Sequence, residues 1–198
     1  MLKVLFTGII ALGALLTLGA GVYFQQGTHP AVFKLDNKCT AFMVRPRVAI
    51  TAGHCFVKNG AQAVQGTFLD GTTDTFTPKI MRFTETGSDF ALLLSNKAHR
   101  SVLTISIRPL QVEDRLTHIG YTKGELLIYQ GVFQSLVHNA DGIMYVFSTI
   151  ADPGNSGGPV LNANGDVVAV FTRILAGRPV GYAMPITFLL DELKAVSY

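Results

Sequence analysis

A serine set among glycines is the residue of this chain best suited to nucleophilic chemistry. Ser156 lies in the run DPGNSGGP at residues 152–159, between apolar stretches, and such a run favours a sharp turn that exposes the hydroxyl. A serine hydroxyl is a weak nucleophile at neutral pH and needs a positioned base. His54, in the run TAGHC, can accept its proton. The two residues together predict attack on a carbonyl carbon.

A histidine base works best when a carboxylate holds its other ring nitrogen and stabilises its positive charge. Asp89 is favoured for this role because it opens the apolar run DFALL, where an ion is costly unless it is engaged. Asp70 and Asp74 are alternatives by their separation from His54. They stand, however, in a Gly- and Thr-rich stretch that is typical of a turn.

The order His54, Asp89, Ser156, each in a run of the matching type, resembles the trypsin-like (chymotrypsin-fold) serine endopeptidases. The resemblance implies an enzyme that hydrolyses a polypeptide substrate through a Ser-His-Asp triad and an acyl-enzyme intermediate, without a cofactor. It implies that the backbone amides of Gly154 and Ser156 form an oxyanion hole. It also implies an all-β fold of two six-stranded antiparallel β-barrels, with the active site in the cleft between them.

The subfamily is less sharply defined by these runs. Asn155 departs from the digestive members, which carry an aspartate there to pair with a new N-terminal ammonium. The runs NGDVVAV at 164–170 and GYAMP at 181–185 are similar to HtrA-like proteases, whereas TAGHC is closer to the trypsin pattern. Two alternatives remain beside a simple protease: an HtrA-like chaperone-protease acting as an oligomer, and a catalytically silent binding protein on the same fold.

The resemblance also implies a substrate pocket. Its positions relative to Ser156 place Ile150 at the base, Ala151 beside it, Phe171 on one wall and Gly181 to Ala183 on the other. None of these residues is charged, so we expect a small or medium aliphatic residue before the scissile bond. Arg173 adjoins this set, and we expect it to be a solvated surface residue; the alternative is that it pairs with an acidic substrate residue and inverts this preference.

The N-terminus predicts export. Residues 4–24 contain no charged residue, follow Lys3, and are long enough to span a bilayer. We therefore interpret residues 1–27 as a cleaved signal peptide or an uncleaved membrane anchor, and residues 28–198 as a secreted or periplasmic domain. Cys39 and Cys55 make an even count in a compartment that permits disulfides, and the family resemblance implies that they pair. Two free buried thiols are the alternative.

The rest of the chain favours one all-β unit. Short apolar runs are broken by Gly, Asn, Asp and Pro; examples are 41–44, 48–51, 75–77, 90–94, 126–130, 143–147 and 167–172. After Pro185, apolar residues recur at helical spacing up to Val196, which predicts an amphipathic C-terminal helix.

Two other classes of partner are not indicated. Net charge is +3 with scattered Lys and Arg, which does not give the basic stripe of a nucleic-acid binder. The remaining histidines show no metal-ligand spacing, so we expect no metal site; they are His29, His99, His118 and His138.

Overall fold

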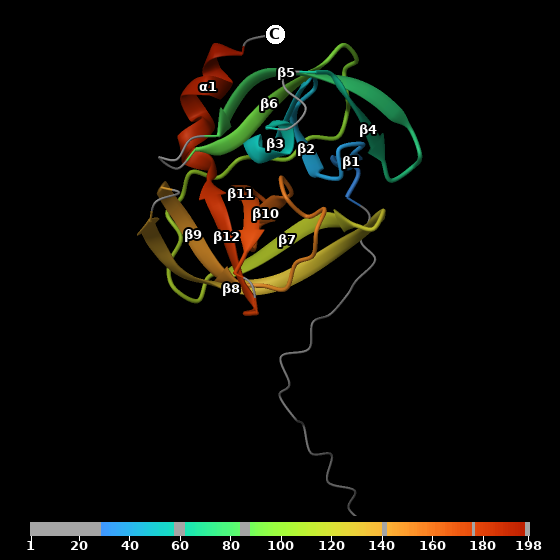
Figure 1. Ribbon diagram of the computed structural model, residues 1–198. Helices are drawn as coiled ribbons and strands as arrows, with labels where there is room; N and C mark the ends of the chain where they lie inside the picture. The colour runs from blue at the N-terminus through green and yellow to red at the C-terminus, as the bar shows by residue number, and fades with distance from the viewer. Residues whose placement is uncertain (1–28, 58–61, 84–87, 140–141, 176, 197–198) are drawn as a thin grey trace, which may run out of the picture.

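The computed structural model describes residues 29–57, 62–83, 88–139, 142–175 and 177–196. These residues form two closed antiparallel barrels of six strands each, one above the other in Figure 1, with a C-terminal helix beside the upper barrel. The fold class predicted from the sequence is confirmed. The segment 1–27, expected to be a signal or an anchor, lies outside the described residues. No helix in the described ranges is long and apolar enough to cross a bilayer.

The first barrel holds the strands between residues 32 and 95. In order of hydrogen bonding they are β1 (Val32–Leu35), β2 (Thr40–Arg45), β3 (Val48–Thr51), β6 (Asp89–Ser95), β5 (Thr73–Phe83) and β4 (Val64–Phe68), and β4 pairs again with β1. Phe33 and Phe76 stack inside this barrel with their ring centroids 4.5 Å apart. A Cβ at Gly66 would lie 2.6 Å from the Phe33 ring, so the packing requires glycine there.

The second barrel is built in the same order from strands between residues 115 and 185. They are β10 (Pro159–Leu161), β11 (Val167–Ile174), β12 (Val180–Pro185), β9 (Gly142–Ser148), β8 (Glu125–Asn139) and β7 (Arg115–Thr122), and β7 closes onto β10. Its core is aromatic. The fully buried His118 ring stacks on Phe171 at 4.0 Å and on Tyr129 at 5.4 Å between centroids.

The C-terminal helix begins directly after the last strand of the second barrel and lies against the first. It starts as a 3₁₀ turn, η2 (Ile186–Leu189), and continues as α1 (Leu190–Ala195), beside β5 and β6 in Figure 1. The guanidinium of Arg45 on β2 donates to the carbonyls of Leu193 and Val196 at 2.7 and 2.8 Å. These bonds satisfy carbonyls that a helix end leaves without partners. The helix therefore joins the two barrels.

Candidate active site

Ser156 lies in a tight turn between β9 and β10 that the first barrel holds in place. Its carbonyl accepts a hydrogen bond of 2.8 Å from the amide of Thr40 on β2. Gly157 has φ +85°, and a Cβ there would lie 2.1 Å from the Thr51 hydroxyl, so no other residue fits without displacing β3. The Ser156 hydroxyl donates to the carbonyl of Thr172 at 3.1 Å.

His54 is carried by a short 3₁₀ helix, η1 (Gly53–Phe56), that follows β3. Gly53 packs so closely on β5 that a Cβ would lie 2.1 Å from the carbonyl oxygen of Arg82. The backbone amide of His54 donates to Asp89 Oδ1 at 2.8 Å, and its ring Nδ1 lies 2.8 Å from Asp89 Oδ2. Because a carboxylate only accepts, Nδ1 carries the proton, and Nε2 is left as the basic nitrogen.

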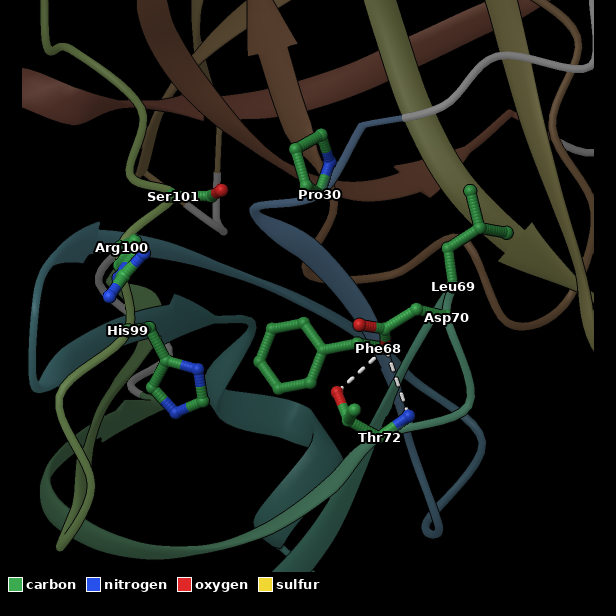
Figure 2. Close-up of a pocket in the computed structure, with 8 residues that line it drawn as sticks. All are labelled: Pro30, Phe68, Leu69, Asp70, Thr72, His99, Arg100 and Ser101. Atoms are coloured by element: carbon green, nitrogen blue, oxygen red, sulfur yellow. Dashed lines mark hydrogen bonds between the residues drawn. The ribbon is translucent and has the colours of Figure 1, made fainter.

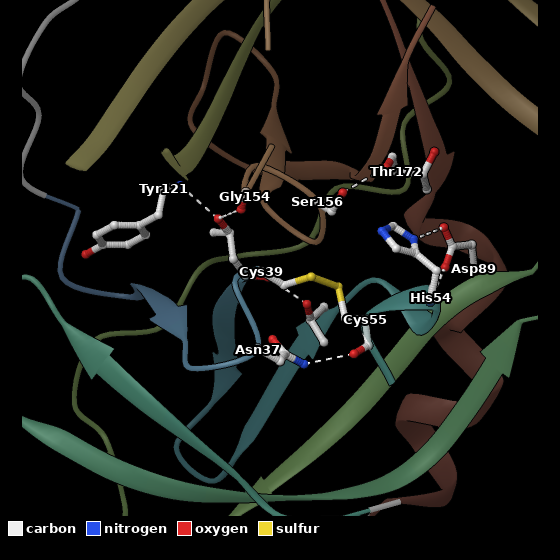
Figure 3. The surroundings of a disulfide bond; sticks show 11 residues. Asn37, Cys39, His54, Cys55, Asp89, Tyr121, Gly154, Ser156 and Thr172 are labelled. Carbon is white, nitrogen blue, oxygen red and sulfur yellow. Dashed lines mark hydrogen bonds and ion pairs between the residues drawn. A yellow bond between two sulfur atoms is a disulfide. The ribbon is translucent and has the colours of Figure 1, made fainter. Parts of the chain in front are cut away.

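Asp89 is buried where the two barrels meet. The residue is 8% exposed at the first position of β6, and its amide lies 3.4 Å from Sδ of Met184 on β12 of the second barrel. The structure thus brings together His54 and Asp89 from the first barrel and Ser156 from the second, around one cavity (Figure 3).

The two alternative acids have other partners. Asp70 Oδ1 accepts from the amide and the hydroxyl of Thr72, at 2.9 and 2.7 Å, and these bonds lower the Asp70 pKa. Asp74 Oδ2 lies 2.8 Å from Nε2 of His99 and accepts from the Ser95 hydroxyl. Neither Asp70 nor Asp74 lines the cavity that contains His54.

The cavity beside Ser156 has a volume of about 440 Å³. Ala151 and Phe171 line it, as the sequence predicted, together with Asp152, Pro153, Thr172 and Ile174. Arg173 also lines it and is exposed, as expected, and its guanidinium carbon lies 5.3 Å from the centroid of the Tyr182 ring.

The other predicted pocket residues lie elsewhere. Ile150 is 44% exposed and lies outside the lining of this cavity, as do the buried Gly181 and Ala183. A Cβ at Gly181 would lie 3.0 Å from the Phe171 ring, so this glycine supports the wall from behind.

A disulfide joins Cys39 to Cys55, as the resemblance implied (Figure 3). It ties the start of β2 to the 3₁₀ helix that carries His54, and Asn37 Nδ2 donates to the Cys55 carbonyl at 2.9 Å. The ring of His54 and both sulfurs lie close enough to share an ion. A metal binds thiolate sulfur, however, and these two sulfurs are bonded to each other.

The turn before Ser156 has an anchor that the sequence did not indicate. Asn155 is completely buried, and its amide nitrogen donates to the carbonyl of Tyr121 at 3.1 Å and to the hydroxyl of Thr122. Thr40 holds the adjacent residue, since its hydroxyl donates to the Gly154 carbonyl at 2.8 Å. Gly154 itself has φ +110°, a conformation that favours glycine. The Gly154 carbonyl is thereby turned toward Thr40.

Burial perturbs two titratable groups close to this site. It lowers the pKa of His118, which lies behind Phe171, to about 3, so this imidazole is neutral at physiological pH. Burial, together with the charge of Asp70, raises the pKa of Tyr121 to about 12. Neither side chain is charged under ordinary conditions.

A larger cavity, of about 560 Å³, lies away from these residues (Figure 2). Phe68 and His99 line it with their rings stacked at 4.8 Å between centroids, and Asp70 at its rim is held by Thr72. None of His54, Asp89 and Ser156 lines it. The smaller cavity is therefore the better candidate for an active site.

Comparisons with known proteins agree with this arrangement. The family described as trypsin-like peptidase domain matches residues 39–170. The serine protease HhoA of Synechocystis sp. is 31% identical over 165 residues, which are 75% of this chain and 39% of that protein. The chain thus spans less than half the length of this curated relative.

Solved structures share the fold. The HtrA-type protease AlgW with a decapeptide has a TM-score of 0.74 at 18% identity, covering 85% of this chain and 64% of that one. The active form of the Rv3671c protease from M. tuberculosis has a TM-score of 0.72 at 18% identity, covering 86% and 82%. At these identities the likeness establishes the fold alone.

Proposed function

Because the chain belongs to the trypsin-like peptidase family, we propose that it is a serine endopeptidase whose triad is His54, Asp89 and Ser156. The observation that carries this proposal is that two hydrogen bonds join His54 to Asp89 and that both residues line the same cavity as Ser156. The pair fixes the tautomer that a general base needs.

The reaction follows from this arrangement. Ser156 Oγ attacks the scissile carbonyl carbon while its proton passes to Nε2 of His54, and Asp89 stabilises the imidazolium that forms. The amides of Gly154 and Ser156 stabilise the negative oxygen. His54 then protonates the leaving amine as the C–N bond breaks. A water molecule, deprotonated by His54, hydrolyses the resulting ester and restores the Ser156 hydroxyl.

Reaction with a fluorophosphonate probe tests the proposal directly. The probe labels a serine only when its hydroxyl is activated, so we expect a single labelled peptide that contains Ser156. Ser156→Ala should lose both labelling and peptide hydrolysis while it keeps nearly the thermal unfolding temperature of the wild type, because removing one oxygen atom from a half-buried side chain leaves little empty space. Hydrolysis by the alanine variant at the wild-type rate would refute the triad.

The same experiment separates the enzyme from a catalytically silent binding protein. A silent protein would bind peptides in the cleft without reacting with the probe. Such proteins usually lose a catalytic residue, whereas His54, Asp89 and Ser156 are all present here.

We also propose that the domain works outside the cytoplasm, as a secreted or periplasmic protein. The Cys39–Cys55 disulfide supports this location, since such bonds persist in oxidising compartments. Fractionation of cells that express the full chain, followed by N-terminal sequencing, would distinguish a cleaved signal from a retained anchor in residues 4–24. Protein found entirely in the cytoplasm with both thiols reduced would contradict the proposal.

A further inference from the structure

A further cavity, here called the lysine cavity, lies beside the turn that carries Ser156. Its volume is about 490 Å³, and three lysines line it: Lys34 on β1, Lys38 in the turn between β1 and β2, and Lys123 in the turn between β7 and β8. The disulfide residue Cys39 and the turn residues Pro153 and Gly154 complete the part that faces the catalytic groups. The lysines come from both barrels, so the cavity exists only when the barrels are packed together.

No carboxylate is among the described residues that line this cavity. No ion pair joins these three ammonium groups to a carboxylate among the described residues. Asp36 and Glu125 are exposed and lie close to these lysines in the sequence, but they do not line the cavity. Lys38 and Lys123 have φ +68° and +51°, a conformation that lysine rarely adopts. The fold therefore concentrates positive charge here at a cost in backbone conformation.

The cavity beside Ser156 and the lysine cavity are neighbours. Pro153 lines both of them, and Gly154, the next residue, lines the lysine cavity. In Figure 3, Gly154 and Tyr121 are on one side of Ser156 and Thr172 is on the other. A chain whose carbonyl oxygen meets the amides of Gly154 and Ser156, and whose preceding residue occupies the cavity beside Phe171, must continue past Gly154 and the disulfide toward the lysines.

The periodicity of an extended chain fixes which substrate residue meets them. Successive side chains point to opposite faces. If the residue before the scissile bond enters the cavity beside Phe171, the next side chain faces away, toward the Cys39–Cys55 disulfide. The second residue after the bond then points to the side of Tyr121 and Lys123, which both line the lysine cavity.

We propose that Lys34, Lys38 and Lys123 make the enzyme select substrates with an acidic side chain at the second position after the scissile bond. This inference rests on the proposed peptidase function. A substrate carboxylate would supply the counter-charge that the cavity lacks. The selected residue belongs to the part of the substrate that leaves as the amine product.

The test compares two internally quenched peptides that differ only at the second position after the bond, Glu in one and Gln in the other, with the cut site confirmed by mass spectrometry. We expect the wild type to cleave the Glu peptide with about fivefold to tenfold higher kcat/KM at low salt, since each solvated ion pair contributes modestly. The preference should shrink as the ionic strength rises.

The variant that tests the lysines is the triple substitution Lys34→Gln, Lys38→Gln and Lys123→Gln, which should bring the Glu/Gln ratio to about one. Lys79→Gln is the matched control, because Lys79 is exposed on β5 and lies outside both cavities. It should keep the wild-type ratio. Equal cleavage of both peptides by the wild type, or an unchanged ratio in the triple variant, would overturn the inference.

A binding measurement tests the acidic preference independently of whether the protein cleaves peptides. The Ser156→Ala protein is titrated with each peptide, labelled for fluorescence anisotropy. Tighter binding of the Glu peptide that depends on the three lysines supports the acidic preference even if the wild type cleaves neither peptide, in which case the peptidase proposal alone fails. Equal binding of the two peptides contradicts the lysine site.

Discussion

His54 and Asp89 are joined by two hydrogen bonds, one from the backbone amide and one from the ring, each 2.8 Å long. The first bond fixes where the carboxylate lies, and the second fixes which ring nitrogen carries the proton. The carboxylate therefore sets both the position and the tautomer of the imidazole.

Asp89→Asn separates these two effects. The asparagine oxygen can still accept from the His54 amide, but its NH₂ group would donate to Nδ1 and leave the proton on Nε2, where the base must be free. We expect kcat to fall by about 10³–10⁴. The change in thermal unfolding temperature should be small by comparison. Steady-state kinetics of peptide cleavage provides the measurement, and a loss of less than about tenfold would show that the carboxylate does not set the tautomer.

Asn155→Asp should damage the turn that carries Ser156. The carboxylate cannot donate to the Tyr121 carbonyl, and it would be a buried charge facing that oxygen. We expect a loss of about 3 kcal/mol or more in the free energy of unfolding, together with reduced fluorophosphonate labelling. Asn155→Ala serves as the control, because it removes the same bonds without adding charge. If the aspartate variant is no less stable than the alanine variant, buried charge is not the cause.

His118 should make the protein sensitive to acid. Burial lowers its pKa to about 3 in the folded state, whereas an unfolded histidine has a pKa of about 6.5. Above pH 6.5 both states are neutral and the stability is fully present. Below pH 6.5 the His118 side chain is protonated in the unfolded state but stays neutral in the folded state. The free energy of unfolding therefore falls by about 1.4 kcal/mol per pH unit until about pH 3.

The variant His118→Phe keeps a planar ring against Phe171 and does not titrate. Urea unfolding at pH 6.5 and pH 4.5 should therefore show an acid loss smaller by about 2–3 kcal/mol than in the wild type. Substituting the exposed His138 by Gln should leave the acid loss unchanged. An identical pH dependence in the Phe variant and the wild type would argue against a buried neutral His118.

The enzyme should prefer Ala, Val or Leu over Lys, Arg or Glu immediately before the scissile bond. Ala151, Phe171 and Ile174 form an apolar lining that offers a buried charge no partner, whereas Asp152 and Arg173, which also line the cavity, are exposed. A peptide library should show at least about a tenfold preference, broad among the aliphatic residues. Dominant cleavage after Glu that disappears in Arg173→Gln would instead assign the specificity to Arg173.

The sequence singled out His54, Asp89 and Ser156, which the structure places around one cavity, because each of them sits in a short local pattern. The glycines at 154 and 157 are required by positive φ and by close packing, and Asp89 opens a buried strand. Such constraints act within a few residues of the chain, so they can be recognised in the sequence before the fold is known.

Features that depend on distant contacts were not predictable in this way. Asn155 is anchored by Tyr121 and Thr122, more than thirty residues away, and nothing in the local run indicates that partner. The lysines of the lysine cavity come from β1 and the turn after it in the first barrel and from the turn between β7 and β8 in the second. Ile150, expected at the base of the substrate pocket, is instead exposed and does not line the cavity beside Ser156.

The C-terminal helix has a consequence for how the protein folds while it is being synthesised. The first barrel is synthesised early, but the buried side chains of Leu189 and Leu193 and the carbonyls that Arg45 binds follow the whole second barrel in the chain. The first barrel, which carries His54, therefore has part of its apolar surface uncovered until residues 186–196 have been synthesised. The cavity that contains His54, Asp89 and Ser156 is thus complete only after both barrels have been synthesised.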